Sequence, residues 1–259
     1  MNAFLDLSLL NGIILLAAGV AIPGLIVVLV ARMLVKNHLT KQHERVGRLL
    51  FRVTASLLAL LISLSYANEK ISYNKVSNSL QEEAAVIASV MLKLKIHRSE
   101  LAEQTRDDIV DYVEFTIDDD WVQIVNNPYV SKMWAKLVFI NIVVQELPED
   151  SEKQKALKAS IITDINLITK TLQIRIYSTQ FHLPYLTYIL GSGLIIVWCF
   201  FSVYRVDRIS IVFITLYNIF IAVILYFVIM LGNPMNGPLK IDPAPFIILK
   251  EMGLEKLPF

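Results

Sequence analysis

The sequence predicts an all-α integral membrane protein with four transmembrane helices and a helical region outside the membrane. Hydrophobic residues make up 55% of the 259 residues and charged residues 18%, against roughly 45–50% and 25% in soluble domains. The apolar residues gather in four runs, each close to the roughly 20 residues that cross a bilayer. Between the second and third runs the chain is charged, lacks glycine, and repeats apolar residues at helical spacing.

Residues 1–67 are predicted to form a first transmembrane hairpin. Its first run, Leu9–Ala31, contains Pro23-Gly24, which indicates a kink or a close helix contact. The residues before it hold no Lys or Arg, so we interpret the run as a retained helix and not as a signal peptide. The second run, Leu49–Ala67, follows a basic loop.

Residues 68–182 are predicted to form a helical region in which helices two and three of the membrane part continue as rods. The predicted helices run from the second apolar run to about Ile96, from Ser99 to Asn126, from Tyr129 to Leu147, and from Asp150 or Ser151 to His182. Ser99 is a typical N-cap residue. The last of these helices repeats apolar residues every three or four positions between Leu157 and Ile176, which indicates one buried face.

Residues 183–231 are predicted to form a second transmembrane hairpin, with runs at Leu183–Tyr204 and Ile209–Leu231. Residues 232–259 are a C-terminal turn and tail. The tail contains a short amphipathic segment, Phe246–Leu254, and the turn at Gly232–Pro238 is rich in glycine, proline and asparagine.

Lys and Arg are concentrated in the two short loops between the apolar runs. These residues are Arg32, Lys36, Lys41, Arg45, Arg48, Arg205 and Arg208. The positive-inside rule therefore predicts that the short loops are cytoplasmic and that the helical region and both termini lie on the other side.

No motif indicates catalysis, a cofactor or a metal site, so we expect a protein that is not an enzyme. The lone cysteine, Cys199, is interpreted as a small buried apolar residue, and the four histidines as solvated or interfacial. The acidic run Asp118–Trp121 is interpreted as part of a solvated helix face and not as a calcium site, because adjacent carboxylates on a helix point in different directions. The net charge of +1 gives no indication of a nucleic-acid partner.

One stripe of small and polar residues follows the second membrane helix. It consists of Ser56, Ala59, Ser63, Tyr66 and Lys70, and continues through Tyr73, Ser77 and Gln81. Small residues and serines allow membrane helices to approach closely, so the stripe could be a helix contact. It could also line a pore between several copies of the chain, with Lys70 at the mouth favouring anions.

Three segments carry a resemblance to a known family. They are the acidic-alanine segment Glu82–Ala85, Tyr112 followed by Asp120-Trp121, and the turn Asn233–Leu239 with the downstream segment Asp242–Phe246. With these segments the chain resembles the prokaryotic bestrophin-like domain family. The resemblance implies four membrane helices, assembly into a homo-oligomer (a pentamer, as in bestrophins), anion conduction with chloride as the candidate ion, and the plasma (inner) membrane of a prokaryote. Bestrophins have a cytosolic helical region, so this resemblance and the charge-based orientation point in opposite directions.

Our leading hypothesis is a homo-oligomeric anion channel whose pore is lined by Ser56, Ala59, Ser63, Tyr66 and Lys70. The alternative is a membrane-anchored interaction or sensor module whose helical region binds another protein and through which no ion passes. The oligomeric state in mild detergent discriminates them, because a ring supports a pore and a monomer supports the anchor.

Overall fold

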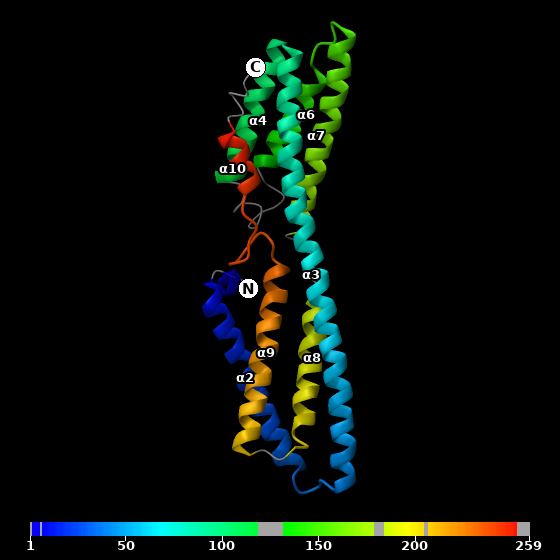
Figure 1. Ribbon diagram of the computed structural model, residues 1–259, viewed down its shortest axis with the longest axis vertical. Helices are drawn as coiled ribbons and strands as arrows, with labels where there is room; N and C mark the ends of the chain where they lie inside the picture. The colour runs from blue at the N-terminus through cyan, green and yellow to red at the C-terminus, as the bar shows by residue number, and fades with distance from the viewer. Residues whose placement is uncertain (1, 6, 119–131, 179–183, 205–206, 253–259) are drawn as a thin grey trace. The chain divides into compact units, whose positions relative to one another are not determined.

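The protein is helical throughout the part that the computed structural model describes, which is residues 2–5, 7–118, 132–178, 184–204 and 207–252 (Figure 1). The helices are, in chain order, α1 (Asn2–Leu5), α2 (Leu9–Val35), α3 (Lys41–His97), α4 (Glu100–Asp118), α6 (Lys132–Gln145), α7 (Glu152–Ser178), α8 (Pro184–Phe201), α9 (Arg208–Leu231) and α10 (Ala244–Glu251). The predicted all-α class is confirmed for these residues. Two compact units form, one from Met1–Tyr73 with His182–Leu239 and one from Asn74–Phe181 with Lys240–Phe259.

Among the described residues, three helices are long and apolar enough to cross a membrane, namely α2, α3 and α9. The third predicted run corresponds to α8, which has 18 residues. Its described apolar part, Tyr188–Phe201, is shorter than the other three candidates. A fourth span therefore stays a prediction.

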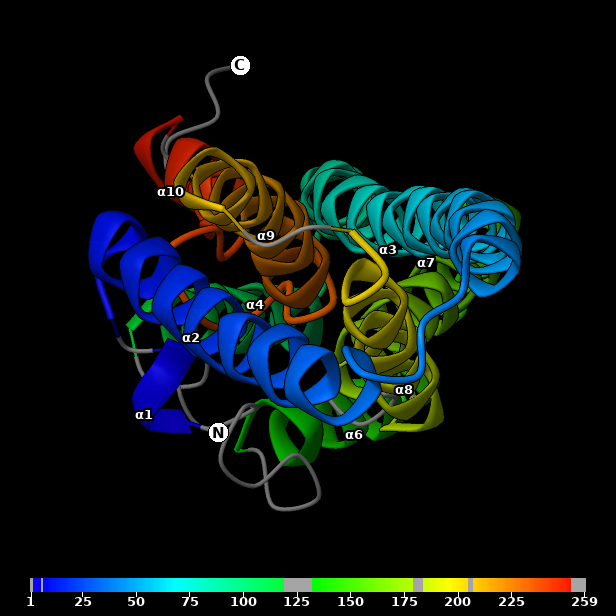
Figure 2. The ribbon, with the colours of Figure 1, turned by 90° about the horizontal axis from the view of Figure 1, so that it is seen from below.

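The first unit is held together by an apolar core in which α2 packs against both α8 and α9 (Figure 2). At Gly24, beside the predicted kink at Pro23, α2 approaches α8 and α9 closely. A Cβ there would lie 2.5 Å from the Asn218 amide nitrogen and 2.8 Å from the Trp198 ring. Trp198 in turn donates a hydrogen bond of 2.9 Å to the Asn218 oxygen, so two polar groups are joined inside the bundle. The sequence prediction of a close helix contact at this glycine is confirmed.

Cys199 is exposed on α8, so the interpretation of this residue as buried is wrong. The neighbouring residues Val197 and Trp198 occupy the face of α8 that packs in the core. One further residue turns the helix by about 100°, which carries Cys199 off that face.

The second unit contains residues 74–97 of α3 together with α4, α6, α7 and α10. No proline occurs in Lys41–His97, and α3 runs without interruption past the end of the second apolar run, as predicted. The Ser99 hydroxyl accepts a hydrogen bond of 3.2 Å from the Ala102 N–H, which confirms the predicted N-cap of α4. On α7, the isoleucines of the predicted apolar face are buried, among them Ile161, Ile165 and Ile168.

His97 ends α3 and is buried, so the prediction of a solvated or interfacial histidine is wrong at this position. One ring nitrogen lies 2.9 Å from the Ser99 hydroxyl and the other 3.1 Å from the Pro148 carbonyl oxygen. The chain reverses direction just after His97, at Arg98, whose φ is 59°. Both ring nitrogens thus have hydrogen-bond partners at the turn, and these bonds offset the desolvation cost of burying this histidine.

Candidate functional site

The five predicted pore-lining residues lie on one flank of α3, and all five are exposed in the single chain. Each residue of an α-helix turns by about 100°. Ser56, Ala59, Ser63, Tyr66 and Lys70 therefore follow one side of the helix in steps of three or four. In the first unit this flank is the polar side of α3.

The two remaining sides of α3 in the first unit are mainly apolar, with Ser65 and Glu69 as polar residues on one of them. One of them packs in the core through Leu58 and Ile62, with Phe51 and Ala55 beside them. The other carries exposed leucines at positions 57, 60, 61 and 64. A side of leucines suits lipid acyl chains, whereas a flank of serines, alanine and tyrosine suits a helix contact or water. The exposure of the polar flank is therefore the feature of α3 that needs a partner.

A groove of about 460 Å³ runs between this flank and α9. Ala59, Ser63 and Tyr66 line it from α3, and Phe220 and Phe227 are among the residues that line it from α9. The structure thus brings three of the five predicted residues together, while Ser56 and Lys70 lie outside the groove. Sequence reasoning missed the contribution of α9, because its apolar residues resemble those of any membrane helix.

Lys70 and its neighbour Glu69 differ in their surroundings. The Lys70 ammonium lies 5.1 Å from the centre of the Tyr73 ring and is exposed. Glu69 is half-buried and faces the C-terminal end of α9. A Cβ added at Gly232, the residue that follows α9, would lie 3.2 Å from the Glu69 carboxylate. Lys70 therefore presents its positive charge at the end of the polar flank.

A second group of polar residues is buried in the second unit. The Arg175 guanidinium of α7 donates hydrogen bonds of 2.7 and 2.8 Å to the two carboxylate oxygens of Glu83 on α3. The Tyr112 hydroxyl of α4 donates a third, of 2.6 Å, to the same carboxylate. Glu83 and Arg175 are both 0% exposed. Burial, with the Glu83 charge second, raises the pKa of Tyr112 well above its ordinary value, which keeps its hydroxyl a donor.

Phe246 of α10 completes this group, which we call the buried cluster: Glu83, Tyr112, Arg175 and Phe246. The Arg175 guanidinium lies 5.5 Å from the centre of the Phe246 ring, and Phe246 is buried. Such cation–π contacts contribute about 0.5–2 kcal/mol. Three of the four residues come from the segments that carried the family resemblance. Arg175 was missed by sequence reasoning, although it stands three residues after Leu172 on the buried face of α7.

The acidic side of α4 is partly neutralised by lysines. Lys136 of α6 lies 3.1 Å from Asp108 and 2.7 Å from Asp111, and Lys250 of α10 lies 2.9 Å from Glu114. The described residues contain no group of three or more metal-ligating side chains. The side chains of the acidic run at 118–121 lie outside the described residues.

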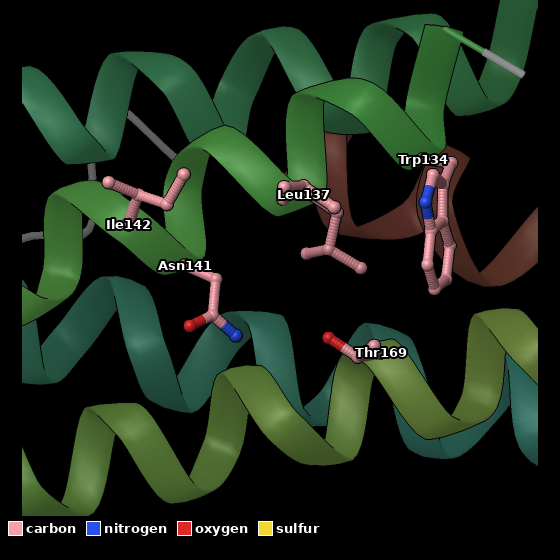
Figure 3. Close-up of a pocket in the computed structure, with 6 residues that line it drawn as sticks. Trp134, Leu137, Asn141, Ile142 and Thr169 are labelled. Atoms are coloured by element: carbon pink, nitrogen blue, oxygen red, sulfur yellow. The ribbon is translucent and has the colours of Figure 1, made fainter.

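A small pocket of about 240 Å³ lies between α6 and α7 (Figure 3). Trp134, Leu137 and Asn141 border it from α6 and Thr169 from α7. Small-molecule sites usually measure about 300–1,000 Å³ and carry converging polar groups. This pocket is smaller, and Asn141 and Thr169 are among the polar side chains that line it.

A family model described as "Bestrophin-like domain" matches residues 18–246, a span that includes the five residues of the polar flank and the whole buried cluster. No curated protein matches the chain.

Proposed function

Because the chain belongs to the bestrophin-like domain family, we propose that it forms a homo-oligomeric ion channel in which α3 lines the pore. Bestrophins supply the plan for the proposal: several copies around an axis, each contributing its second membrane helix. We propose anions, with chloride as the candidate, as the conducted ions.

One observation carries the proposal: Ser56, Ala59, Ser63, Tyr66 and Lys70 are exposed on a helix whose two other sides are mainly apolar. In a bilayer, an exposed polar flank must face a neighbouring helix or water. A ring of copies satisfies this requirement, because each copy turns its polar flank to the axis and its leucines to lipid. Closed rotational symmetry is the usual arrangement of copies of one chain.

The charge and size of the flank support anion conduction. Alanine and serines leave a narrow passage with weakly polar walls, and the Lys70 ammonium at its end attracts anions. Glu69, which would oppose this attraction, faces Gly232.

Replacement of one residue on each side of α3 tests the assignment. Ser63→Trp places a bulky ring on the polar flank, and we expect it to abolish conductance while assembly stays intact. Leu57→Trp places the same ring among the exposed leucines, about 120° around the helix from Ser63, where we expect unchanged conductance. Equal currents from both variants, measured in planar bilayers on protein of the same oligomeric state, would refute a pore along this flank.

The interaction-module alternative makes a different prediction for the same preparations. A module that only anchors the helical unit needs no ring, so it predicts a monomer in mild detergent and no current. A monomeric protein would therefore transfer the assignment to that alternative.

A further inference from the structure

Glu83 and Arg175 form a fully buried ion pair that the proposed pore does not use. Its two hydrogen bonds, 2.7 and 2.8 Å, join α3 to α7. Removing two charges from water is costly, and apolar residues of similar size usually stabilise a fold as well or better. The best-attested use of such a group is to select one arrangement among several that apolar packing would allow.

A second ion pair joins the same two helices. Lys93 of α3 lies 2.6 Å from Asp164 of α7. The two ion pairs are separated by ten residues on α3 (83 to 93) and by eleven on α7 (164 to 175), so their spacing is nearly equal on the two helices. One antiparallel register allows both ion pairs, and a slip of one helical turn, about 5.4 Å, would break both.

Helix α3 extends from this junction to the polar flank without a helix breaker. Gly47 is the last glycine in α3, and the helix contains no proline. Glu83 follows Lys70 by 13 residues, which is about 20 Å along a helix axis. Glu83, Ser63 and Lys70 therefore belong to one helix.

We infer that Glu83 and Arg175 are positioning residues that fix the register of α3 against α7, and that through α3 they set whether the polar flank forms an open pore. Tyr112 holds the carboxylate from α4, and Phe246 covers the guanidinium from α10. The effect on conduction rests on the proposed channel function, whereas the register of α3 against α7 does not.

Distances between spin labels on α3 and α7 test the register directly. Gln81 and Ala159 are exposed positions on these helices and accept nitroxide labels through introduced cysteines. The full chain with Cys199→Ala provides the background, and an excess of unlabelled chain in the assembly limits the signal to distances within one subunit. Pulsed electron paramagnetic resonance then measures the distance distribution.

Three variants of the labelled protein separate a positioning role from a purely stabilising one. In the first, Glu83→Met, Tyr112→Phe and Arg175→Met together replace the polar group by apolar side chains, so that the unit folds. In the second, Arg175→Lys keeps the charge but replaces the planar guanidinium, which donates both hydrogen bonds from Nη2, by a smaller ammonium on a different stem. The third, Lys158→Met, is a control on α7 that removes an ion pair to the exposed Glu149.

We expect the apolar variant to retain its helix content while its label distance shifts by about 5.4 Å or splits into two populations. Its ratio of open to closed channel changes by roughly 5-fold or more, with the unit conductance unchanged. Arg175→Lys gives a broader distance distribution and an intermediate open ratio. Lys158→Met matches the parent in both measurements. If the Glu83–Arg175 pair only stabilised the fold, all three variants would match the parent in both measurements.

An unchanged distance distribution in the folded apolar variant would overturn the inference. A shifted distance with an unchanged open ratio would overturn the link between this register and the pore. If even the unsubstituted protein carried no current, the channel proposal and this link would fail together, while the distances alone would still decide whether Glu83 and Arg175 fix the register.

Discussion

Arg175→Met alone is expected to destabilise the second unit strongly. The substitution removes both hydrogen bonds to Glu83 and leaves a buried carboxylate with the Tyr112 hydroxyl as its remaining partner in the cluster. Breaking a buried ion pair by removing one partner costs about 3–5 kcal/mol, because the other charge stays buried. At roughly 2–4 °C per kcal/mol, the Tm of the protein in detergent should fall by about 6–20 °C.

Replacing the whole polar group should restore most of this loss. With Glu83→Met and Tyr112→Phe added, no charge or unpaired hydroxyl stays buried, and apolar groups of similar volume are tolerated within about 1–2 kcal/mol. The effects of the substitutions are therefore strongly non-additive. Thermal unfolding followed by circular dichroism measures both variants. The reasoning is refuted if Arg175→Met melts within about 2 °C of the parent, or if the apolar combination melts no higher than the single variant.

Three further predictions concern packing, pH and ion selectivity. Gly24→Leu should disrupt the first unit and lower the yield of assembled protein, whereas Gly19→Leu should be tolerated because its Cβ meets nothing within 4 Å; size-exclusion chromatography compares them. Although partial burial lowers the pKa of Lys136, hydrogen bonds to two aspartates outweigh it and raise that pKa above its ordinary 10.5. The stabilisation is therefore complete below about pH 10.5 and is lost as pH rises through the folded value, and melting curves of Lys136→Met should lack this alkaline loss. Lys70→Glu should move the reversal potential away from that of chloride, and an unchanged reversal potential would remove this residue from the conduction path.

The long helix α3 could be predicted from the sequence because its determinants are local. No proline interrupts Lys41–His97, and Ser99 provides the next N-cap. The same reasoning located α9, which spans Arg208–Leu231 against a predicted Ile209–Leu231. It also found the polar flank, because positions on one side of a helix follow from its period.

The buried cluster could not be assembled from the sequence because its partners are distant in the chain. Glu83 and Arg175 are 92 positions apart, and a charged residue in an amphipathic helix is usually exposed. The available signal was the place of Arg175 on the stripe that contains Leu172 and Ile176. That stripe shows that a charge is buried, but only the tertiary structure shows which carboxylate meets it.

The correction at Cys199 and the groove beside α9 have one physical origin. In a membrane helix nearly every residue is apolar, so hydrophobicity does not reveal which side packs inside the protein. The apolar helices α8 and α9 therefore gave no sequence signal for the exposure of Cys199 or for the place of Phe220 in the groove.

The decisive experiment measures current through planar bilayers that contain the purified, assembled protein. Under a chloride gradient, the proposed anion channel gives discrete openings that reverse near the chloride equilibrium potential, and we expect this result. Silence from protein shown to be inserted and assembled would contradict it, and would assign the helices of the second unit to binding another protein.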